Sequence, residues 1–205
     1  EYQKHSIMEL QRVINITRLL KKYFHRTERP VVVTNVGGFN KGGFSPKEQR
    51  PDMYNCVADA LNQIDSDGVE LIIQTMPPFP WHFGGQSYHN LFINPDEIVE
   101  FCSKTGYRIC LDISHSQMAC SYYKWSLDEF VRKVGKYTAH LHVVDALGID
   151  GEGVQIGKGD VDFVQLSKIL DSLMHGVPFV PEIWQGHKQD GAGFWMALEF
   201  LEDYL

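Results

Sequence analysis

Five short runs of apolar, often β-branched residues recur along this chain, and their spacing constrains the fold more than any other feature. The runs cover residues 31–36, 69–76, 107–113, 138–145 and 177–184. Runs of this kind are typical of parallel strands that are buried on both faces. Segments with helical periodicity accompany them, near residues 6–25, 49–65, 95–105, 126–135, 163–174 and 192–204. The alternation predicts an α/β fold built from repeated βα units.

The number of strands favours a single barrel domain that is not complete. An eight-stranded parallel barrel usually needs about 250 residues, whereas this chain has 205. Five strands alone leave a parallel sheet with two uncovered edges. We therefore expect one domain over residues 1–205, a (β/α)8 TIM barrel that holds the fourth to eighth βα units and lacks the first three. The alternative is a doubly wound sheet, but no strand-to-helix junction carries a glycine-rich phosphate-binding motif.

Composition restricts the partners and the compartment. The chain has 26 acidic residues against 19 lysines and arginines, a net charge of −7. Such a surface repels nucleic acid and anionic membranes, so we expect neither as a partner. The four cysteines form no C-x-x-C pair and no zinc-binding spacing. This pattern predicts reduced thiols in a cytoplasmic protein.

Each predicted strand closes with a polar residue. These residues are Asn35, Gln74, Asp112, His142 and Glu182, separated by 39, 38, 30 and 40 residues. The carboxyl ends of barrel strands meet at one mouth, where active sites form. Two carboxylates and an imidazole are costly to bury together without a cation, and mixed oxygen and nitrogen ligands suit manganese, zinc, magnesium or cobalt. The sequence therefore predicts a divalent-metal site that includes Asp112, His142 and Glu182.

Taken singly, each of these residues has a simpler interpretation. A strand-end aspartate such as Asp112 is more often a cap for the following backbone than a ligand. His142 alone suits a hydrogen-bonded core histidine, and Glu182 alone suits a surface charge. Their joint occurrence at successive strand ends is what favours a shared metal ion.

Four segments, taken in order, resemble the second half of the xylose-isomerase-like barrel superfamily. They are LDISH, HLHVVD, IGKGDVDF and PEIW, and the resemblance covers about residues 30–205. That superfamily contains sugar isomerases, sugar epimerases and an apurinic endonuclease branch. By position, the resemblance implies that Gln74, Asp112, His142 and Glu182 bind the metal and that His115 contacts the substrate.

Gln74 departs from the family pattern, which normally has a glutamate there. A glutamine carbonyl can coordinate a metal, but an amide cannot accept a proton as a general base. Glu182 then remains as the catalytic base. A second base would have to be His115, His82 or His187, or the reaction is a one-base isomerisation through an enediolate.

Substrate contacts are expected around the mouth of the barrel. Three prolines stiffen the segment at 76–86, which presents Trp81 and His82. The glycine-rich loop at 148–159 offers Glu152, Gln155 and Lys158, where family members often have a histidine or an arginine. The predicted substrate-binding residues are Asn35, Trp81, His82, His140, Gln155, Lys158 and His187.

The favoured function is a metal-dependent sugar or sugar-phosphate isomerase or epimerase. The segments QTMPPFPWHFGGQ and PEIWQGH also resemble chains associated with sugar-acid biosynthesis. One alternative is a non-catalytic carbohydrate-binding domain attached to another enzyme. Another is an endonuclease-type metal-dependent phosphodiesterase, which the negative charge disfavours. A homo-oligomer and a fused or adjacent enzyme domain both remain open as partners.

Overall fold

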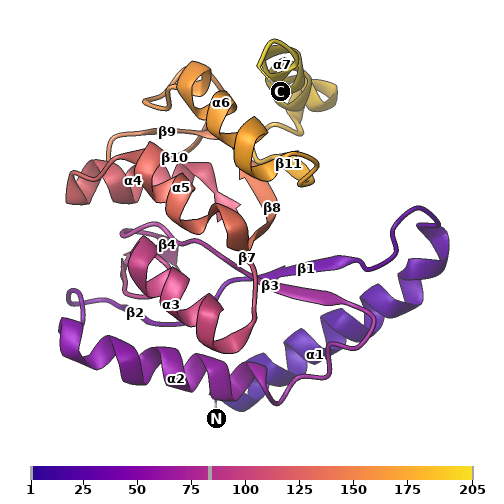
Figure 1. Cartoon of the computed structure of the whole chain (residues 1–205), viewed down its shortest axis with the longest axis vertical. Coiled ribbons are helices and arrows are strands. Elements are labelled where there is room, and N and C mark those ends of the chain that lie inside the picture. Colours follow the sequence, from indigo (N-terminus) through magenta and orange to yellow (C-terminus); the bar gives the residue numbers. More distant parts are fainter. Residues whose placement is uncertain (1, 83–84, 205) are drawn as a thin grey trace.

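The computed structural model describes residues 2–82 and 85–204, and its main feature is one five-stranded parallel sheet (Figure 1). The strand order is β1-β3-β7-β8-β11, so each strand pairs with the next parallel strand along the chain. The strands are β1 (Val31–Thr34), β3 (Glu70–Gln74), β7 (Ile109–Asp112), β8 (Thr138–Val143) and β11 (Phe179–Pro181). All five predicted strands are therefore present, and β1 and β11 lie at the two edges.

Helices cover the outer face of this sheet. In the described residues they are α1 (Tyr2–Leu20), α2 (Arg50–Leu61), α3 (Pro95–Thr105), α4 (Ile113–Tyr123), α5 (Leu127–Val134), α6 (Phe163–Met174) and α7 (Lys188–Glu202). Neighbouring helices contact one another, as α1 does α2, α3 does α5 and α5 does α6. The colours in Figure 1 run in order along the molecule, because each βα unit adds to the side of the preceding one. The expected α/β, TIM-barrel-like architecture is confirmed.

The two faces of the sheet carry separate apolar clusters. The larger cluster lies between sheet and helices and includes Leu71, Leu111 and Leu141. A smaller cluster on the other face contains Ile72, Cys110 and Ala139, with Val31 and Val33 beside it. Because side chains alternate along a strand, the residues two positions after Ile72 and Cys110 continue the smaller face. That face therefore leads directly to the predicted metal ligands.

Helix α4 was not predicted. It starts immediately after Asp112, and seven of its residues are buried: Ile113, Ser114, His115, Ser116, Met118, Ala119 and Cys120. A helix that is buried on most sides has no polar stripe, so its sequence lacks the periodicity by which the other helices were found. The last predicted helix, in contrast, agrees with the structure. Gln189, Asp190 and Gly191 have positive φ angles, so regular helix begins only after them.

Short antiparallel pairs are built onto the carboxyl end of the sheet. After β1 and β3, β2 (Phe39–Asn40) pairs with β6 (Tyr88–His89), and β4 (Trp81–His82) pairs with β5 (Gly85–Gln86). After β8, β9 (Asp145–Leu147) and β10 (Gly151–Val154) form a hairpin. The strand within the run at 138–145 is shorter than the run, because the chain leaves the sheet after Val143 and Asp145 starts the hairpin.

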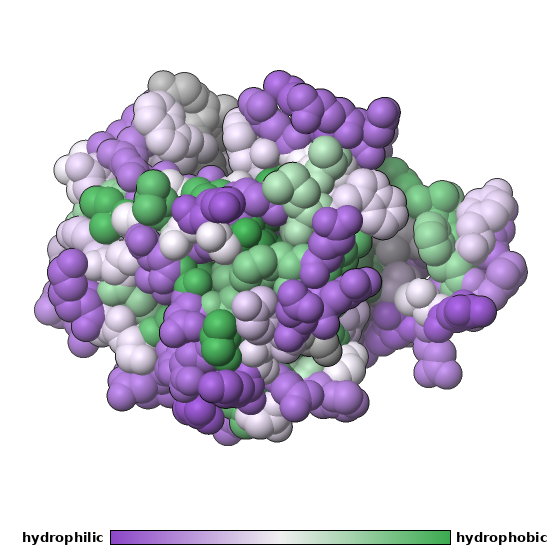
Figure 2. Space-filling view, turned by 90° about the horizontal axis from the view of Figure 1, so that it is seen from above, coloured by the Kyte–Doolittle hydropathy of each residue, from purple (hydrophilic) through white to green (hydrophobic). Residues whose placement is uncertain are grey.

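Apolar side chains remain exposed at the last sheet edge and the helix beside it. The exposed residues there include Phe179 and Val180 on β11, and Trp195 and Met196 on α7. These elements lie at the top of Figure 1, and the view from above in Figure 2 shows hydrophobic patches between hydrophilic side chains. Within the described ranges, no helix combines the length and the apolar composition needed to cross a bilayer.

Candidate metal centre

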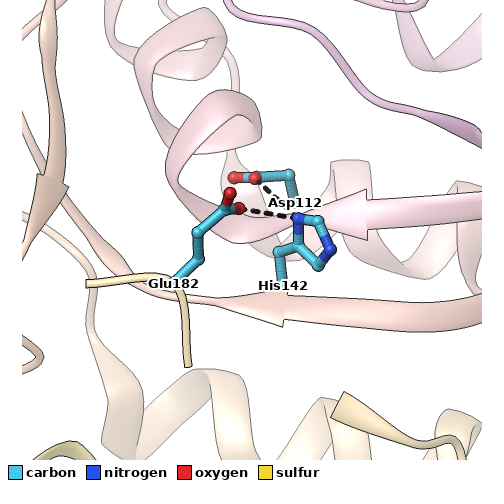
Figure 3. A group of neighbouring side chains, drawn as sticks. All are labelled: Asp112, His142 and Glu182. Carbon is cyan, nitrogen blue, oxygen red and sulfur yellow. Dashed lines mark ion pairs between the residues drawn. The ribbon is translucent and has the colours of Figure 1, made fainter. Parts of the chain in front are cut away.

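Three strands bring Asp112, His142 and Glu182 together, as Figure 3 shows. Asp112 ends β7, His142 lies opposite it in the register of β8, and Glu182 follows the last residue of β11. One ligand atom from each side chain lies within 4.8 Å of the others. His142 Nδ1 is 2.7 Å from Glu182 Oε2 and 3.5 Å from Asp112 Oδ2. The predicted convergence of these three strand ends is thus present in the structure.

Asp112 has two structural tasks. Its side chain caps α4, because Oδ1 accepts a hydrogen bond from the backbone N–H of His115 at 2.9 Å. Its other oxygen, Oδ2, faces the cluster, and the residue is 1% exposed. One oxygen of this aspartate therefore caps the helix, while the other lies within the cluster.

Gln74 ends β3 and lies in the same cluster. Its Nε2 donates to Asp112 Oδ2 at 2.8 Å and lies 3.0 Å from His142 Nδ1. The amide therefore occupies the fourth position that the family pattern gives to a glutamate. Either end of the amide can face the cluster, since its oxygen and nitrogen have nearly the same shape.

His115 adjoins the cluster from the first turn of α4. Its Nδ1 is 2.7 Å from the carbonyl oxygen of Thr75, which can only accept, so this nitrogen carries a proton. Its Nε2 is 3.0 Å from Oε1 of Glu152, on β10. The ring is buried, and its Nδ1 also lies 3.6 Å from Asp112 Oδ2. Only the Nε2 side of this histidine faces the mouth.

The charges of the cluster shift its pKa values. Burial disfavours the imidazolium of His142, but hydrogen bonding to Asp112 and the nearby Glu182 outweigh it and raise its pKa to about 12. Burial also opposes charge on His115, yet Asp112 and Glu152 raise its pKa to about 9. Burial favours the neutral form of Asp112, but His115 and His142 hold its pKa below the usual range. His140, whose ring is 5.5 Å from that of His142, has its pKa lowered by burial and by the charge on His142.

The donor set fits a divalent cation. Two carboxylates and an imidazole nitrogen are ligands that manganese, zinc, magnesium and cobalt accept. Ligands at about 2.0–2.2 Å from one ion lie about 3–4 Å from each other, and the separations within the cluster fall close to this range. The buried negative charge of Asp112 is a further reason for a cation here.

The other predicted substrate contacts lie around this centre or on the surface. His140 is beside His142, and Trp81 is 68% exposed on β4. His82 belongs to β4, but its side chain is outside the described part of the molecule. The structure places Asn35, Lys158 and His187 at exposed positions and Gln155 at a half-buried one. Within the described residues, no hydrogen bond or ion pair joins these last four side chains to Asp112, His142 or Glu182, so their role in binding stays a prediction.

Two residues of the site were missed by sequence reasoning. Thr75 fixes His115 through its carbonyl, and its hydroxyl accepts a hydrogen bond from the backbone N–H of Asp112 at 2.9 Å. Asp145 is fully buried and accepts from the backbone N–H groups of Ala146, Gly157, Gly159 and Val161 at 2.8–3.0 Å. The Asp145 contacts close the base of the loop that carries Glu152. The glycines of GKGD indicate a tight loop whose backbone N–H groups can surround one acceptor, but they do not identify Asp145 as this acceptor.

Comparison with known proteins agrees with this geometry. The family model of the xylose isomerase-like TIM barrel matches residues 1–204. The chain belongs to this family. Among curated proteins, the uncharacterized protein MJ1614 of Methanocaldococcus jannaschii is 31% identical over 115 residues, which make up 55% of this chain and 39% of that protein.

Solved structures of the family share the fold. A D-tagatose 3-epimerase-like protein has a TM-score of 0.61 at 21% identity, and the match covers 85% of this chain and 61% of that protein's chain. An L-ribulose 3-epimerase has a TM-score of 0.67 at 15% identity, covering 97% and 66%. A xylose isomerase domain protein from Planctomyces limnophilus has a TM-score of 0.64 at 17% identity, covering 97% and 63%. The chain therefore spans about two fifths of the curated relative and under two thirds of these structures.

Proposed function

We propose that this chain is part of a metal-dependent sugar isomerase or epimerase, with its active site at Asp112, His142, Glu182 and Gln74. The observation that carries the proposal is the convergence of two carboxylates and an imidazole within 4.8 Å at three strand ends. The family membership points the same way, and the structural neighbours include an L-ribulose 3-epimerase and a D-tagatose 3-epimerase-like protein. A small sugar or a sugar derivative, including a sugar acid, is the proposed substrate.

Asp112, His142 and Glu182 would hold the divalent ion, with the side-chain oxygen of Gln74 as a fourth ligand. Such an ion, when bound, polarises a carbonyl group of the substrate and stabilises negative charge on its oxygen. Glu182 is the residue suited to move the proton. Its side chain is 54% exposed at the mouth, so it can reach a substrate while it remains beside His142.

Gln74 limits the chemistry to one strong base. An amide cannot take a proton from carbon, so a mechanism with a carboxylate on each face of the substrate is not available. We infer that Glu182 removes a proton from one carbon and returns it to a neighbouring carbon through an enediolate, with His115 binding the substrate. Gln74 equally suits the second candidate, a carbohydrate-binding domain without turnover.

The two edge strands bear on how the whole barrel is formed. In an eight-stranded barrel β1 and β11 would each have a further neighbour. We propose that the five strands correspond to the fourth to eighth strands of the barrel, and that three further βα units close it. The coverage of the structural relatives, 61–66% of their length, supports this assignment.

Proton exchange tests the proposed activity. The protein is loaded with Mn²⁺, its metal content is measured by mass spectrometry, and candidate ketoses are incubated with it in deuterated water. We expect about one equivalent of metal and the appearance of deuterium at the carbon next to the carbonyl, seen by NMR. Metal binding with sugar binding but no exchange would favour the carbohydrate-binding domain, and an absence of metal binding would contradict the metal-dependent enzyme.

A further inference from the structure

The hairpin of β9 and β10 determines what a substrate meets when it reaches His115. Nδ1 of this histidine donates a hydrogen bond to the carbonyl oxygen of Thr75, so only Nε2 remains for a ligand. Oε1 of Glu152 lies 3.0 Å from that nitrogen. A substrate group that binds Nε2 must therefore approach the carboxylate of Glu152 or displace it.

The segment that carries this carboxylate is fixed by backbone hydrogen bonds to Asp145 and to Trp184. At the base of the hairpin, Asp145 accepts four hydrogen bonds, one from Ala146 and three from residues 157–161, and these fix the chain that follows β10. On β10, the carbonyl oxygen of Gly153 accepts from the backbone N–H of Trp184 at 2.9 Å. A Cβ on Gly153 would lie 2.9 Å from Cβ of Trp184, and φ is +73° there, so only glycine allows this approach. Glu152 is thus presented by a segment fastened to the turn that follows Glu182.

The charges around this position are mostly negative. Glu152, Asp112 and Glu182 provide three carboxylates, and His115 lies between the first two. The ion pairs that lysines and arginines form within the described ranges involve Glu9, Asp65, Glu97, Glu100, Glu70 and Asp96, all away from the cluster. The amine of Lys188 donates to Gln185 instead. A phosphate or a carboxylate that binds Nε2 of His115 would therefore also lie against the carboxylate of Glu152.

We infer that Glu152 is a specificity-determining residue, which selects substrates whose group at His115 is an uncharged hydroxyl and disfavours a phosphate or a carboxylate there. A carboxylate only accepts hydrogen bonds, so its partner must donate one, as a hydroxyl does. Two negative groups at about 4 Å repel each other strongly in a partly buried site. The inference rests on the proposed function and specifies its substrate class: neutral sugars at this end of the site.

Binding calorimetry on the Mn²⁺-loaded protein tests the inference. The probes are D-fructose, D-fructose 1-phosphate and D-fructose 6-phosphate. We expect the wild-type protein to bind D-fructose at least about tenfold more tightly than at least one of the two fructose phosphates. The reason is that two negative groups in contact repel each other. Glu152→Gln should reduce this discrimination about tenfold, and Glu152→Lys should reverse it. The side chain of Glu152 is 54% exposed, so both variants should keep the fold, which circular dichroism checks.

Asp150→Asn is the matched control, because it removes one negative charge from the same hairpin two residues away. Its discrimination should equal that of the wild-type protein. If both phosphates bind the wild-type protein as tightly as D-fructose, or if the ratio is the same in Glu152→Gln, the inference is wrong while the proposed function stands. If the metal-loaded protein and all variants bind none of the three probes, the proposed function itself is contradicted, and the inference with it.

Discussion

At the scale of single residues, Glu182 and Asp112 differ in how much of the fold depends on them. Glu182 follows a short edge strand and is 54% exposed. Asp112 is 1% exposed and caps α4. Substitutions at the two positions should therefore separate chemistry from folding.

Glu182→Gln should lower proton exchange by at least about 100-fold, because the amide cannot accept the proton. The free energy of unfolding should change by less than about 0.5 kcal/mol, as at other exposed positions. Exchange measured by NMR and urea unfolding measured by circular dichroism check the two parts. Glu199→Gln on α7 is the control for loss of one exposed acidic group, and equal exchange rates in both variants would exclude Glu182 as the base.

Asp112→Ala should both abolish metal binding and destabilise the protein by about 1–3 kcal/mol. It removes the helix cap and leaves the buried amide of Gln74 without its acceptor. Asp112→Asn keeps an oxygen for the N–H of His115, so it should lose metal affinity with a smaller loss of stability. Metal titration and urea unfolding distinguish the two variants. Full metal affinity in Asp112→Asn would contradict the assignment of the carboxylate as a ligand.

The sequence was sufficient to predict that Asp112, His142 and Glu182 meet, but not the contacts that hold them. Asp112, His142 and Glu182 could be found because each ends an apolar run, and strand ends meet at one edge of a parallel sheet. The link between His115 and Glu152 joins residues 37 positions apart on a helix and a hairpin that were not predicted. Such a contact depends on the path of the loop, which no local pattern encodes.

At the scale of elements, the loop between β8 and α6 depends on one buried carboxylate. Asp145→Ala would leave four backbone N–H groups without their acceptor, which should cost on the order of 3 kcal/mol. Urea unfolding measures this loss, and faster amide exchange across residues 145–161 would locate it.

Asp160→Ala is the control for the Asp145 variant. Asp160 is exposed and accepts one hydrogen bond, from the backbone N–H of Gly148 at 2.7 Å. Its removal should cost less than about 1 kcal/mol. Similar losses in the two variants would show that the carboxylate of Asp145 does not hold the loop.

Elements with one exposed and one buried side were predictable, and fully buried or very short ones were not. α3 and α6 agree with their predicted ranges because polar and apolar residues alternate with helical periodicity along them. α4 was missed because it is buried on most sides. The strands β2 and β6 are set by pairing between distant segments, whereas β4 and β5 pair within a few residues of each other. All four have two residues, and a pair of residues carries no period.

At the scale of the whole molecule, a bound ion should stabilise the folded state, because its ligands come from three separate strands. At a free metal concentration of about 100 times Kd, the stabilisation should be about 2.7 kcal/mol. Thermal unfolding with Mn²⁺ and with a chelator measures it. His142→Ala should unfold at the same temperature under both conditions, and an equal metal effect in this variant would place the ion elsewhere.

The exposed sheet edge should also affect how the molecule behaves in solution. Phe179 and Val180 present apolar side chains on the edge strand β11. Edges of this kind favour association with other chains. Val180→Lys should therefore reduce concentration-dependent self-association, measured by analytical ultracentrifugation, whereas Lys168→Arg on α6 should leave it unchanged. No difference between Val180→Lys and the wild-type protein would contradict a role for this edge.

The double task of Asp112 affects how relatives of this chain are to be judged. A relative without the proposed activity would still be selected to keep this aspartate, since α4 would otherwise lose its cap. Glu182 caps none of the described helices and is 54% exposed, so selection for folding alone would allow its substitution. The retention of Asp112 in a homologue is therefore poor evidence of an active enzyme, and the retention of Glu182 is the informative mark.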